Sequence, residues 1–125
     1  MSYLLDTHVF LWALSDPDRI RSKIRALILN PLYPVFISAI TAVEISIKQT
    51  LGKLQAPNNL EQEIEKRGFQ TLALEYRHGA RLRHLPNHHQ DPFDRLLLAQ
   101  ALEESLTLIT HDKKLTSYSA KILLT

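Results

Sequence analysis

The stretch DPFDRLLLAQALEESLTLI, residues 91–109, contains a helix followed directly by a strand. Asp91 and Pro92 open the helix, because an acidic N-cap followed by proline suits a first helical turn. We expect the helix to run to about Glu104. Residues 106–109, Leu-Thr-Leu-Ile, form a short and mostly apolar run, as buried strands of parallel sheets do. This helix–strand order indicates an α/β protein.

The same alternation continues outward from this stretch. We expect strands at residues 3–5, 35–37, 69–74, 106–109 and, more weakly, 121–124. We expect helices at residues 7–14, 18–29, 39–51, 59–66, 75–84 and 91–104, with a single turn at 112–115. Short apolar strands that alternate with helices indicate a parallel sheet covered on both faces. We therefore predict a three-layer α/β/α sandwich with a central, mostly parallel sheet of four to five strands, formed by residues 1–125 as a single domain.

The composition restricts the available chemistry. The chain has no cysteine, which excludes disulfides, a thiolate nucleophile and sulfur-ligated metals, and which fits a reducing cytoplasm. No apolar run approaches the ~20 residues that a membrane span needs. Asp6 and His8 interrupt the apolar N-terminal stretch, so no signal peptide is expected. We expect a soluble, cytoplasmic protein.

Four acidic residues lie where a folding chain usually avoids charge. Asp6 ends the first apolar strand and Asp112 follows the fourth, so both should emerge at the carboxyl edge of the sheet, where ligands of such folds bind. Glu44 and Asp94 fall within apolar helical stripes. An isolated carboxylate in apolar surroundings is costly unless a cation compensates it. Four such positions predict one shared divalent metal.

Glu44 is the hardest of the four acidic residues to explain without a metal, because it lies in the middle of a predicted helix. The buried stripe of that helix is predicted to consist of Ile40, Val43, Ile47 and Leu51. Glu44 points into this stripe, where helix capping does not explain it. A buried ion pair with Lys48, one turn later, would explain it without a metal.

Each of the other acidic residues, taken alone, can be explained by its position at the start of a helix. Asp6, Asp91 and Asp112 could each be helix N-caps, and Asp94 could complete a first turn that the helix dipole favours. Asp91 is best explained as a pure cap, because Pro92 follows it. The joint occurrence of the other acidic residues favours a single site.

Carboxylates without thiolates suit Mg²⁺ or Mn²⁺, which prefer oxygen ligands. Such a centre can activate water and stabilise a phosphoryl transition state. The predicted catalytic and metal-binding residues are Asp6, Glu44, Asp94 and Asp112. Residues that could hold a carboxylate or a water beside them are Ser38, Thr110 and Asp91.

Four segments resemble the VapC-type toxins of the PIN-domain family. They are residues 4–8, residues 37–45 with 52–54, residues 89–101 and residues 109–115. The resemblance implies Mg²⁺- or Mn²⁺-dependent hydrolysis of RNA by the same four carboxylates, a homodimer and a cognate antitoxin that blocks the active site. One departure is His8, where many relatives carry asparagine.

Arginines gather between residues 77 and 95, among several histidines, although the formal net charge of the chain is only +2. Clustered arginine most often meets nucleic acid, and the alternative is a solvated helix face. The candidate contacts to RNA or antitoxin are Arg81, Arg83 and Arg95.

Three other functions fit parts of the sequence. A zinc hydrolase would use His84, His88 and His89, but Pro86 interrupts the helix that would align the first two. A structure-specific DNA nuclease of the same fold would use the same carboxylates. A non-catalytic, receiver-like binding module would share the architecture, but it needs a phosphoacceptor aspartate after a central strand and a lysine after the last, and neither is convincing here.

Overall fold

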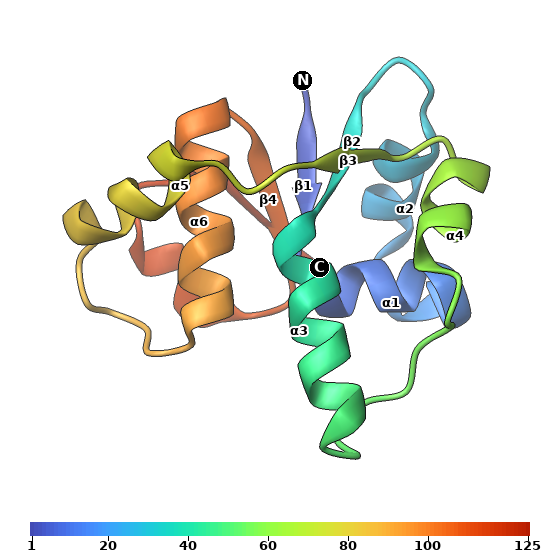
Figure 1. The fold of residues 1–125 in the computed structure, drawn as a ribbon. Helices are drawn as coiled ribbons and strands as arrows, with labels where there is room; N and C mark the ends of the chain where they lie inside the picture. The colour runs from blue at the N-terminus through green and yellow to red at the C-terminus, as the bar shows by residue number, and fades with distance from the viewer.

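The computed structural model describes all 125 residues and contains a five-stranded sheet in the order β3-β2-β1-β4-β5 (Figure 1). The strands are β1 (Tyr3–Leu5), β2 (Val35–Ser38), β3 (Gln70–Leu72), β4 (Thr107–Thr110) and β5 (Ile122–Leu124). All four neighbouring pairs are parallel. The predicted α/β fold with a parallel sheet is confirmed, with five strands.

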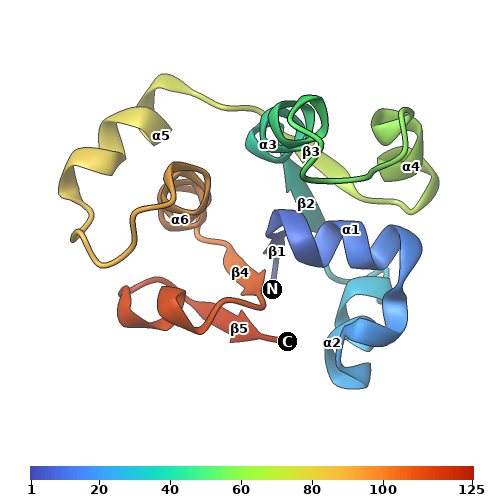
Figure 2. The same cartoon turned by 90° about the horizontal axis from the view of Figure 1, so that it is seen from below.

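Helices cover both faces of the sheet. They are α1 (Thr7–Ser15), α2 (Ser22–Leu29), α3 (Ala39–Thr50), α4 (Leu60–Lys66), α5 (Tyr76–Arg81) and α6 (Pro92–Glu104), with 3-10 turns η1 (Pro17–Arg19), η2 (Leu82–His84) and η3 (Lys113–Ser117). Figure 2 shows α1, α2 and α4 on one side of the sheet and α5 and α6 on the other. Helix α3 continues past the carboxyl edge of the sheet, between α1 and α6 (Figure 1). None of the helices combines the length and apolar character required to cross a bilayer.

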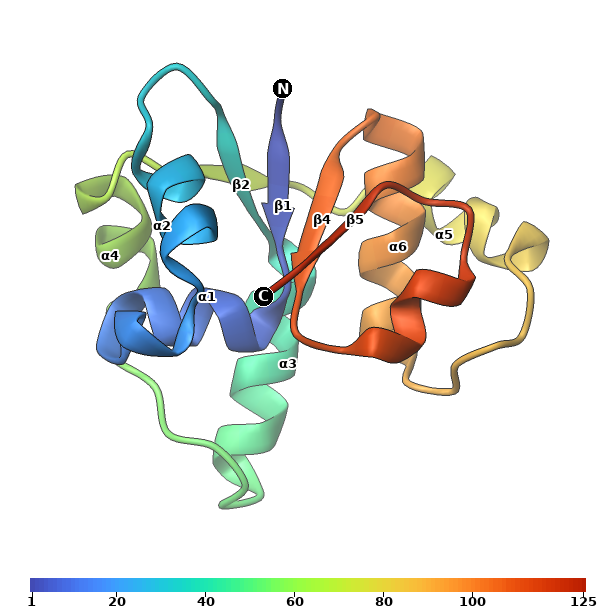
Figure 3. The same cartoon turned by 180° about the vertical axis from the view of Figure 1, so that it is seen from behind.

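Alternating side chains of the strands build two cores, one on each face. Tyr3, Leu5 and Ile109 pack with the buried residues of α1 and α2. Leu4 and Leu108 point the other way, into a cluster with α6 and η3. Figure 3 shows α1 and α2 over the first face, with β5 at the edge of the sheet beside β4. Because both faces are covered, β1, β2 and β4 are mostly buried and do not alternate between apolar and polar residues, whereas the edge strand β3 exposes Gln70 and Thr71.

Three predicted elements differ from those in the structure. The helix expected at 18–29 is divided into η1 and α2, because Ile20 between them is extended and buried in the core. The helix expected at 75–84 ends as the 3-10 turn η2, and Leu85 after it is extended ahead of Pro86, as residues before proline prefer. The strand expected at 69–74 contains only Gln70–Leu72.

The stripe predicted to be buried on α3 is wrong except at its first residue. Val43, Ile47 and Leu51 are 50%, 44% and 61% exposed. The buried residues of the helix are instead Ile40, Thr41, Glu44 and Ile45. Helix α3 leaves the sheet at its first turn, so only the side toward α1 and α6 is covered. Glu44 is buried, but on a face that the apolar periodicity did not identify.

Candidate metal centre

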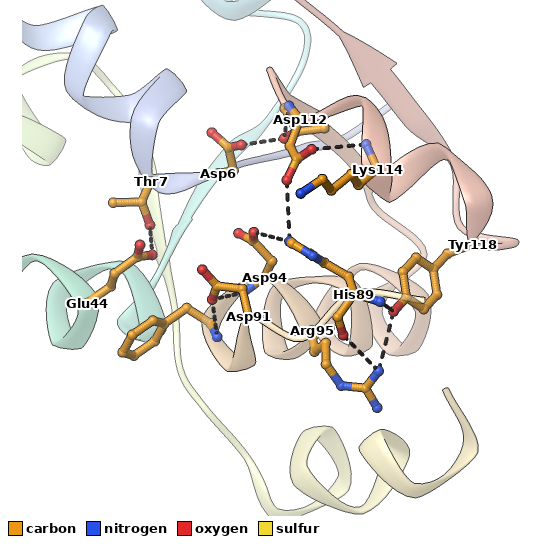
Figure 4. A network of polar contacts seen from close by, with 12 residues as sticks. Asp6, Thr7, Glu44, His89, Asp91, Asp94, Arg95, Asp112, Lys114 and Tyr118 are labelled. Carbon is orange, nitrogen blue, oxygen red and sulfur yellow. Dashed lines mark hydrogen bonds and ion pairs between the residues drawn. The ribbon is translucent and has the colours of Figure 1, made fainter. Parts of the chain in front are cut away.

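Parallel pairing of β1 with β4 brings Asp6 and Asp112 to one edge of the sheet. Leu5 is in register with Ile109, and the Asp6 amide donates to the Ile109 carbonyl at 3.0 Å. Helix α6 begins at this edge, with Asp94 in its first turn. Figure 4 shows the carboxylates of Asp6, Asp94 and Asp112 facing a common space from three separate segments.

Asp6 and Asp112 each cap a helical turn and also face the common space. Oδ1 of Asp6 accepts the Val9 amide at 2.9 Å and caps α1, while Oδ2 accepts the Thr110 hydroxyl. Oδ1 of Asp112 accepts the Lys114 amide at 2.9 Å and caps η3, which leaves Oδ2 directed toward the common space. Each of these aspartates therefore uses one oxygen to begin a helical turn and holds its side chain in place by doing so.

Thr110 links the two aspartates that follow the strands. Its hydroxyl donates to Asp6 and accepts the Asp112 amide at 3.0 Å, so one buried side chain orients both segments. Asp91 caps α6 by accepting the Phe93 and Asp94 amides at 2.8 and 3.2 Å. Ser38 caps α3 through the Ile40 amide at 2.9 Å and donates to Gln100. Of the three predicted supporting residues, only Thr110 contacts a carboxylate of the site.

The protein alone does not compensate the negative charge at this edge. Burial raises the pKa of Asp6 above its usual value, although the Thr110 hydrogen bond acts against this. Burial, together with the negative charges of Asp91, Asp6 and Glu44, raises the pKa of Asp94 to about 6, although the hydrogen bond from His89 acts against this. Carboxylates behave in this way when they are withdrawn from water without a counter-charge.

Glu44 lies to one side of the three aspartates, on α3 (Figure 4). Its Oε1 accepts the Thr7 hydroxyl at 2.6 Å, and its Oε2 is 2.5 Å from Nζ of Lys48. The ion pair considered from the sequence is therefore present. The structure brings Asp6, Asp94 and Asp112 together and places Glu44 at the rim with its own cation, so a metal-binding role for Glu44 stays a prediction.

His89 joins the aspartates and was not predicted to do so. Its Nε2 lies 2.9 Å from Oδ2 of Asp94 and 3.3 Å from Oδ2 of Asp112. Donor atoms of these three residues all lie within 4.8 Å of one another. The sequence drew attention to His89 only as a zinc ligand beside His84 and His88, and both of those are exposed and outside this group.

The donor set fits a divalent cation. His89, Asp94 and Asp112 offer carboxylate oxygens and one imidazole nitrogen, without sulfur. Beside them, the pKa values of the buried Asp6 and the partly buried Asp94 are raised, and a bound cation would lower both. A second group, Glu75, His78 and Glu104, has a comparable composition. There the Arg77 guanidinium already pairs with both glutamates, so that group needs no metal.

The predicted arginines differ in their surroundings. Arg81 pairs with Glu103 at 2.7 Å, whereas Arg83 is exposed and forms no ion pair. Arg95 donates to the Pro86 carbonyl at 2.9 Å and to the Tyr118 hydroxyl at 3.3 Å, so its guanidinium holds the loop before α6. Their contacts to RNA or to a partner stay predictions.

A buried polar network behind the site was also missed. Gln100, fully buried on α6, accepts the Ser38 hydroxyl and donates to the Ala73 carbonyl at 3.2 Å. It lies 3.3 Å from Nδ1 of His78, which is also fully buried. The network joins the end of β2 and the segment after β3 to α5 and α6. Single buried polar residues in apolar helices were the only sequence signal for it.

Residues 3–121 match the PIN domain family. No curated protein matches the chain in sequence. Among solved structures, the chain is similar to one in VapBC2 from Rickettsia felis bound to a DNA fragment from their promoter, with 20% identity, a TM-score of 0.73 and coverage of 100% of this chain and 98% of that one. A chain of FitAcB from Neisseria gonorrhoeae has 22% identity, a TM-score of 0.68 and coverage of 97% and 96%. DNA-bound VapBC from Salmonella typhimurium has 18% identity, a TM-score of 0.66 and coverage of 98% and 97%. At these identities the likeness establishes the shared fold.

Proposed function

The chain belongs to the PIN-domain family, and on this premise we propose that it is a Mg²⁺- or Mn²⁺-dependent endoribonuclease and the toxin of a toxin–antitoxin pair. PIN domains are generally nucleases. The observation that carries the proposal is the convergence of Asp6, Asp94 and Asp112 at the carboxyl edge of the sheet, with pKa values raised for the first two. A bound cation would stabilise the ionised form of such a cluster, and a divalent cation between carboxylates is suited to phosphodiester hydrolysis.

The metal, when bound, activates water and neutralises charge that develops on the phosphoryl group. Asp6, Asp94 and Asp112 would hold it, with Thr110 fixing the position of Asp6. Glu44, held by the Thr7 hydroxyl, would orient the attacking water or accept its proton. The Lys48 ammonium beside Glu44 brings positive charge to the rim, where the phosphate of a substrate would approach.

Two protein partners belong to the proposal. A cognate antitoxin is supported by the similarity to VapBC chains, because the VapBC proteins are a family of toxin–antitoxin systems. A homodimer is supported by the exposed apolar side chains of Val43, Ile47 and Leu51, which follow one another along α3 at intervals of four residues.

The nuclease proposal is tested with single-stranded RNA and DNA of the same sequence, in Mn²⁺, Mg²⁺ or EDTA. We expect cleavage of RNA only, and only with metal. Asp94→Asn should be inactive. Asp91→Asn, three residues earlier, should retain most activity because asparagine caps a helix as well as aspartate does. Cleavage that survives Asp94→Asn would contradict the proposed centre, and cleavage of DNA alone would favour the DNA nuclease.

The toxin proposal is tested by induced expression. We expect growth arrest with the wild type, none with Asp94→Asn, and rescue by the protein encoded in the adjacent gene but not by an unrelated antitoxin. Normal growth with an enzyme that is active in vitro would separate the nuclease from the toxin role.

A further inference from the structure

We propose that His89 is itself a ligand of the metal centre, through Nε2, and that this nitrogen makes the centre discriminate against Mg²⁺ in favour of transition metals such as Mn²⁺ and Co²⁺. The inference rests on the proposed function in one respect, that the centre binds a divalent cation. It adds a fifth candidate ligand, from the loop before α6, to the four predicted carboxylates.

The distances around Nε2 are those expected between neighbouring ligands. Two ligands about 2.1 Å from an octahedral ion and at a right angle to each other lie about 3 Å apart. Nε2 of His89 lies 2.9 Å from Oδ2 of Asp94 and 3.3 Å from Oδ2 of Asp112. The same spacing suits hydrogen bonds from Nε2–H when no ion is bound. Nδ1 makes no hydrogen bond within the protein, so the ring proton can move there when Nε2 binds the ion.

The backbone of His89 is held from both sides. Its amide donates to the Tyr118 hydroxyl at 2.9 Å, and its carbonyl lies 3.5 Å from Nη1 of Arg95. Arg95 also donates to the same Tyr118 hydroxyl and to the Pro86 carbonyl. Figure 4 shows this arrangement directing the His89 ring toward Asp94 and Asp112. Residues from α6 and from the end of η3 thus combine to fix one position of the loop.

The loop directs only one of its two adjacent histidines, His89 and not His88, toward the carboxylates. The His88 side chain is exposed, with its ring 5.2 Å from the ring of Tyr118, and it contacts no carboxylate. The His89 side chain is only 13% exposed.

A nitrogen ligand changes which ions the centre prefers. Carboxylate oxygens suit Mg²⁺ and Mn²⁺ alike, whereas imidazole favours the transition metals, in an order that places Co²⁺ above Mn²⁺. Removal of His89 should therefore weaken Co²⁺ binding most, Mn²⁺ binding less and Mg²⁺ binding least.

The test compares His89→Gln with the matched control His88→Gln in the full chain, without RNA. Dissociation constants for Mg²⁺, Mn²⁺ and Co²⁺ are measured by calorimetry. We expect His89→Gln to bind Mn²⁺ about tenfold or more weakly, with a larger loss of affinity for Co²⁺ and a smaller one for Mg²⁺. Mutation of a residue that only hydrogen-bonds to a metal ligand already lowers metal affinity 10–100-fold, and loss of a ligand should cost at least as much. His88→Gln should match the wild type. Pulsed electron paramagnetic resonance of the wild-type Mn²⁺ complex should also show a directly bonded nitrogen.

Equal losses of affinity for the three ions would make His89 only a positioning residue and would overturn ligation. Tighter binding of all three ions would make His89 a competitor of the metal and would overturn it too. Unchanged binding by His89→Gln, or no nitrogen coupling in the wild-type spectrum, would also contradict ligation. The spectrum answers the question even if His89→Gln does not fold. Failure of the proposed function looks different, because the wild type would then bind none of the ions or would bind them as well after Asp94→Asn.

Discussion

Asp94→Asn should stabilise the metal-free protein while it abolishes activity. Burial and neighbouring charges raise the pKa of Asp94 from 3.8 to about 6, which corresponds to roughly 3 kcal/mol less favourable ionisation in the folded state. The carboxylate keeps some access to water, and the start of α6 favours a negative charge there by about 0.5 kcal/mol. A net gain of about 2 kcal/mol for the asparagine variant remains above pH 6.

The stability difference between Asp94→Asn and the wild type should depend on pH. The folded pKa lies above the unfolded one, so Asp94 costs nothing below about pH 3.8, where both states are protonated. The cost grows between pH 3.8 and 6 and is complete above pH 6. The advantage of the variant should therefore appear as the pH rises through this range.

Chemical denaturation in EDTA, at pH 4.5 and at pH 8, measures the difference directly. At pH 8 we expect Asp94→Asn to gain about 2 kcal/mol, or roughly 6–10 °C in Tm, and at pH 4.5 most of the gain should be gone. Asp18→Asn makes the same chemical change at an exposed ion pair with Arg25 and should stay within about 0.5 kcal/mol of the wild type. With Mn²⁺ at 100 times its Kd, the wild type should recover about 2.7 kcal/mol and the variant much less. A variant that is less stable at pH 8, or a difference that does not depend on pH, would refute the reasoning.

Further predictions concern the surroundings of Asp94. Glu44→Gln should cost about 1 kcal/mol in chemical denaturation, because Lys48 is partly exposed and can reach water, and should reduce cleavage by about 100-fold if the carboxylate handles the attacking water; full activity would make the pair structural. Thr110→Val leaves a buried oxygen of Asp6 without its donor, so denaturation should show a loss of about 1–3 kcal/mol and calorimetry a 10–100-fold weaker metal affinity; unchanged affinity would limit Thr110 to folding. Arg83→Gln should lower the slope of log RNA affinity against log salt, measured in an inactive background, without altering Mn²⁺ binding; an unchanged slope would assign Arg83 to solvent or to a protein partner.

The sequence predicted the fold because the central strands β1, β2 and β4 are short, mostly apolar and buried, and several of the helices begin at recognisable caps. Asp91, for example, caps α6 as expected. The face of α3 was harder to predict, since the period of Val43, Ile47 and Leu51 identifies an apolar stripe but not whether another element covers it. That depends on where α3 leaves the sheet, which is a property of the whole fold.

The candidate site was predictable to a similar degree. The approach of Asp6 to Asp112 follows from strand pairing, and their position could be inferred from parallel topology alone. His89 could not be placed, because its direction depends on the packing of Tyr118, 29 residues later, against a loop without a regular period. Glu44 was correctly expected to be buried, but its Thr7 hydrogen bond required the helices to be placed in space.

The bond between Thr110 and Asp6 spans 104 positions of the chain, and this separation sets a time for the appearance of the centre. A ribosome adds about 5–20 residues per second, so roughly 5–20 seconds pass between the synthesis of Asp6 and that of Asp112. Throughout that interval the nascent protein has β1 but not β4, and the first aspartate lacks the partners that gather around it. A chain interrupted before β4 lacks Thr110 and Asp112, so the candidate metal centre can form only when nearly the whole chain has been made.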